Sequence, residues 1–262
     1  MDQPADATMA GGYNSAPRKV GDTVVRAAGP WSPNVHALLR HLERAGFSEA
    51  PRAISLTDDH AEEVLAFVPG QAGTYPVREA QRSAAALTNM AVTIRRMHDA
   101  TQGFVAPEPG RWQSRAVLPT EIDCIGHNDL GPYNIVYDGT DVAAIIDWDF
   151  AAPSSRAWDL AYAAHRFAPL STPVTTRAFG WDPLPDQGRR LRIFAEAYGD
   201  LIDPAELIDI LVVRLAAIAA HIEAGIRDGD ARFDRHRDER HGDSYRADLA
   251  YILDYRARWS RS

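Results

Sequence analysis

Hydrophobic and polar positions change their spacing near the seventieth residue. Before it, short apolar runs bounded by turn residues predict three strands, at residues 23–26, 53–56 and 64–68. Between the first two, Ser32 and Pro33 suit the N-cap and first position of a helix that ends before Gly46. Pro69 and Gly70 then interrupt the pattern. This part is predicted to be a small unit of strands and one helix.

Beyond Gly70, apolar residues recur at steps of three and four, the spacing of helices that bury one face. The pattern predicts helices at residues 80–97 and 207–222, and further helices are expected at residues 156–167, 187–198 and 244–259. The segment from Arg227 to Asp243 mixes charged residues and His without apolar periodicity, so it is predicted to be a solvated loop. An acidic rim that attracts a cationic substrate is its alternative interpretation. The predicted fold class is α+β.

Three residues that flank a predicted hairpin carry the candidate chemistry. Asn134 follows Asp129 by five residues, and Asp147 comes thirteen residues after Asn134. Phosphoryl transfer needs a carboxylate at the acceptor hydroxyl and Mg²⁺ at the phosphates, and Mg²⁺ takes hard oxygen ligands while keeping several waters. Asp129 is therefore the candidate for the hydroxyl, and Asn134 and Asp147 are the candidates for the metal. The alternative is a purely structural role, in which each Asp is an ordinary turn residue or helix cap.

The sequence between Asn134 and Asp147 predicts how these residues meet. Apolar runs at residues 135–137 and 143–146 flank the turn-forming sequence Asp-Gly-Thr-Asp. A hairpin returns the chain on itself, so Asp147 is expected beside Asn134.

At these residues the chain resembles the aminoglycoside phosphotransferase family, relatives of the protein kinases. The resemblance rests on the His-x-Asp-x-x-x-x-Asn loop that starts at His127 and on the Ile-Asp-Trp that contains Asp147. It extends from Met97 to Ala161, where Asp159 matches a buried Asp that braces the catalytic loop in such folds.

The resemblance implies a two-lobed protein-kinase-like fold, with a nucleotide-clamping lobe at residues 1–70 and a mainly helical lobe with the catalytic loop and substrate region at residues 71–262. It implies transfer of the γ-phosphate of ATP or GTP to a hydroxyl of a small molecule, with Mg²⁺ as cofactor. An aminoglycoside antibiotic is one candidate acceptor. The alternatives are a metabolic kinase acting on an amino alcohol, sugar or amino acid, and a nucleotide-binding pseudokinase.

The nucleotide side departs from the family pattern. Kinase-type lobes usually place a Lys on the third strand, but Lys19 is the only lysine here and the strand at residues 23–26 ends in Arg26. Arg26 is therefore assigned the phosphate contact by position, although its planar fork differs from an ammonium. Glu43 is the only acidic residue in the following helix, so the usual ion pair is expected to be missing or rebuilt.

Two further pairs of residues are candidates for nucleotide binding. Gly11 and Gly12 could cover the phosphates through backbone N–H groups, and a plain turn is equally compatible with them. Phe67 and Val68 fall where a hinge between lobes would hold the adenine base, or they simply end a strand.

Composition and charge argue against several classes of protein and structural features. The net charge of −8 disfavours a nucleic-acid binder. Cys124 is the only cysteine, so no internal disulfide forms, and its apolar surroundings predict a buried core residue. No segment reads as a signal peptide or a membrane span, so the cytoplasm is the expected location. The sequence leaves the oligomeric state open.

Overall fold

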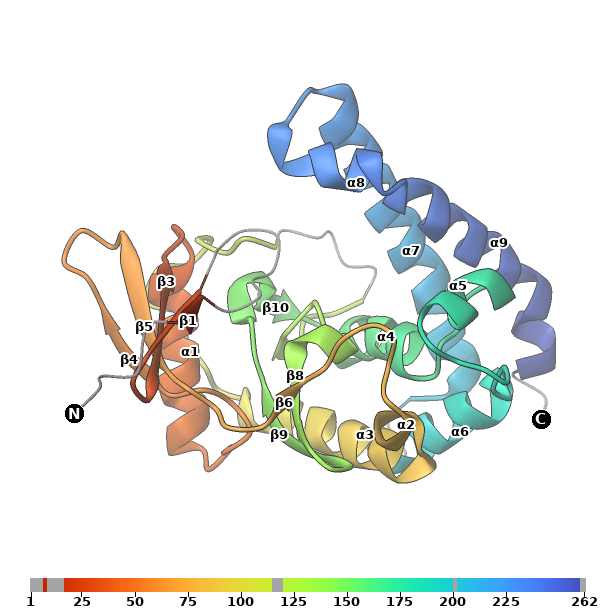
Figure 1. The fold of residues 1–262 in the computed structure, drawn as a ribbon, viewed down its shortest axis with the longest axis horizontal. Helices are drawn as coiled ribbons and strands as arrows, with labels where there is room; N and C mark the ends of the chain where they lie inside the picture. Colours follow the sequence, from red (N-terminus) through yellow and green to blue (C-terminus); the bar gives the residue numbers. More distant parts are fainter. Residues whose placement is uncertain (1–6, 9–16, 115–119, 200–201, 260–262) are drawn as a thin grey trace.

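The computed structural model describes residues 7–8, 17–114, 120–199 and 202–259. Gly11 and Gly12, predicted to cover the phosphates, lie outside the described residues. Figure 1 shows strands and one helix at one end of the molecule, long helices at the other, and smaller strands between them. The α+β class and the two-lobed kinase-like fold are confirmed.

A five-stranded sheet forms the small lobe, in the order β1-β2-β3-β5-β4. Its strands are β1 (Ala7–Thr8), β2 (Arg18–Val20), β3 (Thr23–Ala27), β4 (Ala53–Leu56) and β5 (Glu62–Ala66). The third predicted strand starts two residues earlier than expected, because Glu62 and Glu63 extend the antiparallel pairing with β3.

One helix, α1 (Ser32–Arg44), follows β3 and buries the side chains of Val35, Leu38, Leu39 and Leu42. The predicted N-cap is displaced by one residue: Trp31 is the N-cap and makes no side-chain capping bond, and Ser32 is the first helical residue. Gly46 adopts a φ of +79°, which confirms its predicted place after the helix end.

Short strands position the candidate residues. The hairpin of β8 (Ile135–Asp138) and β9 (Asp141–Ile145) is confirmed, and β6 (Gln71–Ala72) pairs with β8. A second pair, β7 (Cys124–Gly126) and β10 (Ala152–Ser154), lies on the two sides of this hairpin in sequence. Cys124 is buried as predicted.

The helical lobe contains α2 (Glu79–Arg82), α3 (Ala84–Ala100), α4 (Arg156–Phe167), α5 (Pro173–Ala178), α6 (Gln187–Tyr198), α7 (Pro204–Arg227), α8 (Asp234–Asp238) and α9 (His241–Trp259). The stripe at residues 80–97 is not one helix. Ser83 has a ψ of 159°, which ends α2, and its side chain accepts a hydrogen bond from the N–H of Ala86 to cap α3.

The solvated loop predicted at residues 227–243 is also wrong in part. A 3₁₀ turn η3 (Ala231–Phe233) and α8 occupy its centre, because the Asp230 side chain accepts from the N–H of Arg232 and caps the turn. The segment still exposes most of its side chains.

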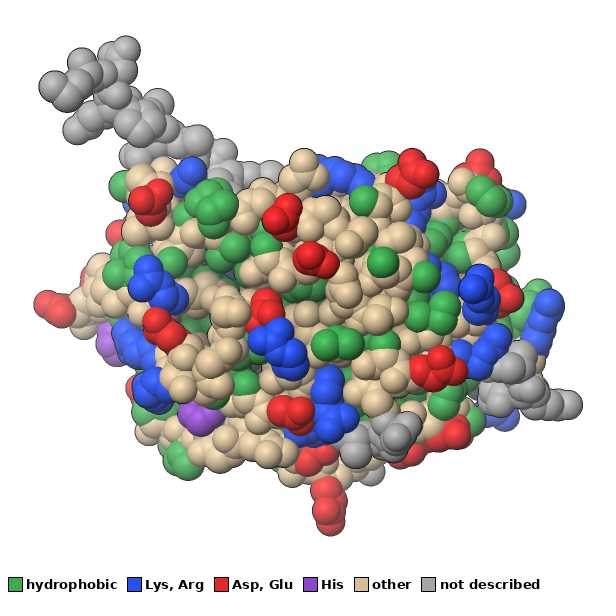
Figure 2. All heavy atoms as spheres, turned by 90° about the horizontal axis from the view of Figure 1, so that it is seen from below, with side chains coloured by type: hydrophobic (Ala, Val, Ile, Leu, Met, Phe, Trp, Pro, Cys, Tyr) green, Lys and Arg blue, Asp and Glu red, His purple; other side chains and the backbone are tan. Residues whose placement is uncertain are grey.

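One face of the molecule carries side chains of both charges. Figure 2 shows acidic and basic side chains interspersed over one face of the molecule. Among the described residues, no helix is long and apolar enough to cross a membrane.

Candidate functional site

A buried carboxylate organises the loop that follows β7. Asp159 of α4 accepts hydrogen bonds from the backbone N–H groups of His127 and Asn128, both at 2.8 Å, and contacts His98 Nε2 at 3.2 Å. Burial alone would raise the pKa of Asp159, but the hydrogen bond from His98 and the nearby Arg214 guanidinium hold it below its usual range. Asn128 adopts a φ of +62°, and its carbonyl accepts from Arg214 of α7 at 2.6 Å. These contacts suit the role that the resemblance implies for Asp159, which is to brace the catalytic loop.

His127 links the same loop to the end of β9. Its Nε2 lies 3.0 Å from the carbonyl oxygen of Ile146, and its Nδ1 lies 3.3 Å from the backbone N–H of Asp129. The neutral tautomer with hydrogen on Nε2 satisfies both contacts. The ring therefore holds the loop in place beside the hairpin.

Asp129 is half-buried, and each of its carboxylate oxygens has a different neighbour. Tyr133 Oη donates to Oδ1 at 2.7 Å, while Asn134 Nδ2 donates to Oδ2 at 3.0 Å and to the Asp129 carbonyl at 2.9 Å. Burial raises the pKa of Asp129, and the Tyr133 hydrogen bond opposes that rise.

The hairpin brings Asp147 back to Asn134, as predicted. The backbone N–H of Ile146 donates to the carbonyl of Asn134 at 2.8 Å, directly before Asp147. Asp147 has a φ of +61°, a left-handed conformation that costs a non-glycine residue about 1 to 2 kcal/mol. The tertiary contacts of this carboxylate therefore hold a strained backbone.

This pair of residues fits a Mg²⁺ ion. Both side-chain hydrogen bonds that Asn134 makes within the described residues use its nitrogen, so its amide oxygen is available as a hard ligand, and the Asp147 side chain is 37% exposed. Within the described residues, no group of three or more His, Cys, Asp and Glu side chains forms a metal cluster. Two protein oxygens, completed by waters and phosphates, match the preference of Mg²⁺.

Arg26 lies at the centre of a carboxylate cluster that the sequence did not predict. Its Nε, Nη1 and Nη2 bond to Glu63 at 2.6 Å, Asp147 at 2.9 Å and Asp149 at 2.5 Å. Only 10% of its side chain is exposed, and Glu63 is 1% exposed. Burial raises the pKa of Asp149 to about 6, with Arg26 acting in the opposite direction.

The expected ion pair is rebuilt from a different element. The partner of Arg26 is Glu63 on β5, and His36 of α1 contacts that carboxylate at 2.8 Å. Glu43, the helix residue considered from the sequence, is exposed. One signal could have identified Glu63: it alternates with buried Leu65 along β5, and a glutamate on a buried face needs a charged partner.

Phe67 and Val68 lie on the connection between β5 and β6, both partly buried. The N–H of Phe67 donates to the carbonyl of Asp22 at 2.9 Å, and Lys19 Nζ lies 3.9 Å from its ring centroid. Their contact with an adenine base stays a prediction.

The sequence also missed an aromatic cluster beside Asp129. Tyr133 Oη contacts Tyr162 Oη at 3.2 Å, and Tyr162 Oη contacts Tyr245 Oη at 3.2 Å. Arg166 of α4 lies against the rings of Tyr133 and Tyr162, although residues 156–167 had been predicted only as a helix.

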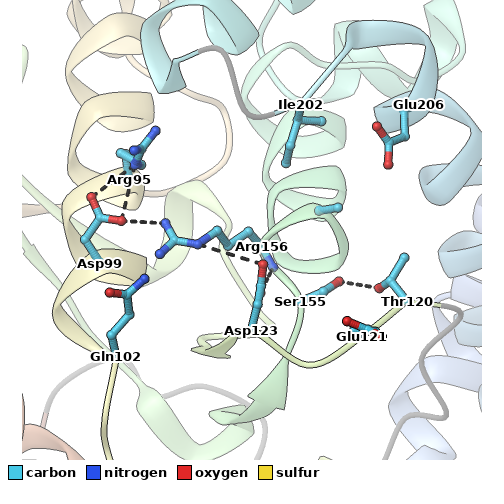
Figure 3. Close-up of a pocket in the computed structure, with 11 residues that line it drawn as sticks. Arg95, Asp99, Gln102, Thr120, Glu121, Asp123, Ser155, Arg156, Ile202 and Glu206 are labelled. Carbon is cyan, nitrogen blue, oxygen red and sulfur yellow. Dashed lines mark hydrogen bonds and ion pairs between the residues drawn. The ribbon is translucent and has the colours of Figure 1, made fainter.

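A separate cavity of about 580 Å³ lies between α3 and α4 (Figure 3). Arg156 Nη1 pairs there with Asp99 at 2.7 Å, and Arg156 also faces Asp123. Neither Asp129 nor Asp147 lines it. The cavity is therefore not the place where the candidate residues meet.

Comparisons with known proteins agree with this geometry. Residues 107–206 match the model of a phosphotransferase enzyme family. The chain is 32% identical over 194 residues to a trifolitoxin immunity protein of Rhizobium leguminosarum bv. trifolii, covering 73% of each protein.

Two solved structures share the fold. An amicoumacin kinase in complex with AMP-PNP, Ca²⁺ and Ami has a TM-score of 0.65 and 15% identity, covering 90% of this chain and 88% of that one. The GDP complex of an aminoglycoside 2'-phosphotransferase-IIIa has a TM-score of 0.61 and 14% identity, covering 98% and 94%.

Proposed function

Because the chain belongs to the phosphotransferase enzyme family, we propose that it transfers the γ-phosphate of ATP to a hydroxyl group of a small molecule. The observation that carries the proposal is the meeting of Asp129, Asn134 and Asp147 at the start and end of one hairpin. A base carboxylate and two hard metal ligands are the parts that phosphoryl transfer needs.

Asp129 would orient the acceptor hydroxyl. As the bond from the γ-phosphorus to the bridging oxygen of ADP breaks and the bond to the acceptor oxygen forms, the acceptor proton would pass to Asp129. Because the transition state is largely dissociative, this proton transfer comes late and needs little basicity. The carboxylate needs instead a fixed position, which Tyr133 and Asn134 supply through hydrogen bonds to its two oxygens.

Asn134 and Asp147 would hold Mg²⁺, which supplies charge neutralisation at the phosphates when bound. Arg26 would meet the phosphates from the small lobe, with Glu63 fixing its position from behind. Its terminal nitrogens contact Asp147 and Asp149, so nucleotide and metal are expected to compete for these contacts. The lobe boundary at residue 70, and the contacts of Gly11, Gly12, Phe67 and Val68 with the nucleotide, belong to the same proposal.

For both the nucleotide and the acceptor, we propose one preferred class and one alternative. AMP-PNP and GDP in the two solved relatives support a purine nucleotide, with ATP preferred here and GTP as the alternative. The relative named for trifolitoxin immunity supports a hydroxylated antimicrobial compound as acceptor. A metabolic alcohol is the alternative.

The test is a transfer assay with γ-labelled ATP or GTP, Mg²⁺ and a panel of hydroxylated antibiotics, amino alcohols, sugars and hydroxy acids. Asp129→Asn is the control: it should abolish transfer while Mg²⁺-dependent nucleotide binding, measured by calorimetry, stays intact. Equal loss of binding and transfer would contradict the role of Asp129. Absence of nucleotide binding in the unaltered protein would contradict the proposed function itself.

A further inference from the structure

Arg166 differs from the other arginines of the helical lobe's interior in how its charge is satisfied. The terminal nitrogens of Arg190 and Arg214 donate to backbone carbonyls, such as Phe167 at 2.9 Å and Asn128 at 2.6 Å. Arg166 makes no hydrogen bond and no ion pair within the described part of the chain, and its Nε is fully buried. Arg166 as a whole is only partly buried, so the terminal nitrogens of its guanidinium, which have no acceptor in the described part of the chain, are available for a ligand.

Four aromatic rings surround this guanidinium. Its Cζ lies 5.2 to 5.6 Å from the ring centroids of Phe179, Tyr75, Tyr133 and Tyr162. Tyr75 and Phe179 stack on each other at 4.2 Å. Cation–π contacts of this kind stabilise the charge and fix its direction, but they leave the N–H donors unused. The rings therefore hold a rigid, unused hydrogen-bonding fork.

This fork lies near Asp129, with Tyr133 as the shared neighbour. Asn134, a proposed metal ligand, donates to Oδ2 of Asp129, whereas Tyr133 donates to Oδ1. The ring of Tyr133 is also one of the rings that contact Arg166. Arg166 is thus linked through Tyr133 to the carboxylate oxygen of Asp129 that Asn134 does not contact.

The exposed carboxylates near the end of α7 and start of α9 do not form a free acidic surface. Each of five is paired with an arginine: Asp230, Asp234, Asp238, Glu239 and Asp243. Paired charges attract a cation weakly, so this rim gives no support to a polycationic acceptor.

We propose that the acceptor carries a carboxylate, which the Arg166 fork binds while Asp129 takes the hydroxyl. The inference rests on the proposed phosphotransfer function and names its substrate class: a hydroxylated acid, rather than an aminoglycoside-like polycation. Arginine suits this task because its planar fork matches both oxygens of a carboxylate. The apolar faces around it suit the carbon skeleton that joins the acid to the hydroxyl.

The direct test is NMR observation of the Arg166 side-chain Nε–H resonance, assigned with Arg166→Lys. The unaltered protein, with Mg²⁺ and AMP-PNP, is titrated with glycolate, L-serine and a dipeptide ending in serine, and with the amide of each at equal ionic strength. The acids should shift the resonance and the amides should not. If no acid shifts it, or acid and amide shift it equally, the proposal is overturned. A shift with Mg²⁺ and AMP-PNP alone, without further change from any acid, would assign Arg166 to the transferred phosphoryl group and overturn it as well.

A kinetic arm uses the same pairs of compounds, together with aminoglycosides and amino alcohols. Arg166→Lys should raise KM for an accepted acid by about 10- to 100-fold, the range for losing a charged, bidentate contact, with a smaller change in kcat. Arg95→Met is the matched control, because Arg95 also lies over a tyrosine ring, at 5.7 Å from Tyr198, but faces the cavity of Figure 3. Transfer to aminoglycosides at wild-type KM in Arg166→Lys would overturn the substrate class and leave the phosphotransfer function standing. Loss of Mg²⁺-dependent nucleotide binding in the unaltered protein would instead mark failure of that function.

Discussion

Replacing Glu63 with alanine should destabilise the small lobe far more than its place on a short strand would suggest. Glu63 is 1% exposed and accepts from Arg26 at 2.6 Å and from His36 at 2.8 Å. Hydrogen bonds to charged groups contribute about 1.5 to 3 kcal/mol each. Arg26 keeps Asp147 and Asp149, so part of its interaction energy survives. We expect a loss of about 2 to 4 kcal/mol in the free energy of unfolding.

For a chain of this size, that loss corresponds to a fall in Tm of about 4 to 16 °C, measured by circular dichroism and checked by urea denaturation. Glu62→Ala is the matched control on the same strand. Glu62 is 50% exposed, and its pair with Arg18 is 3.3 Å long, so its loss should cost less than about 1 kcal/mol. Equal effects of the two substitutions would refute the buried cluster.

Three further predictions concern the rest of the site. Tyr133→Phe removes a hydrogen bond to the charged form of Asp129, so the pKa of Asp129 should rise and the acid limb of the pH–rate profile should move to higher pH. An unchanged acid limb would show that Tyr133 does not lower the pKa of Asp129. The pKa of Asp149 is raised from its ordinary value of 3.8 to about 6 in the folded protein, so its contribution to stability is present below pH 3.8 and is lost as pH rises through 6. Urea denaturation between pH 4 and 7 should therefore favour Asp149→Asn increasingly over the unaltered protein, and a constant difference would contradict the raised pKa. Asp159→Ala leaves two backbone N–H groups without their acceptor, so we expect a loss of about 3 to 5 kcal/mol in a thermal melt, whereas a loss below 1 kcal/mol would show that Asp159 does not brace the loop.

The sequence predicted those parts of the site that depend on short-range order. The hairpin could be predicted because turn residues at 138–141 lie between two apolar runs, and local geometry alone then returns Asp147 to Asn134. Helices with a repeating apolar face were found for the same reason. The elements it missed, such as β6, β10 and α5, are at most six residues long, too short for a period to show. The break at Ser83 was missed because the apolar stripe continues through it.

By itself, then, the sequence determined most of the longer strands and helices and the order of Asp129, Asn134 and Asp147, because their spacing is short enough for local geometry to act. Only the tertiary structure decided which side chains meet across long distances in the chain. Arg26 is 37 positions from Glu63 and 121 from Asp147, and no spacing rule connects them. Likewise, the sequence predicts a helix at α4, but it cannot show that Arg166 of this helix lies among aromatic side chains from other segments. Periodicity records which face of an element is buried, whereas the packing of whole elements determines which neighbours that face meets.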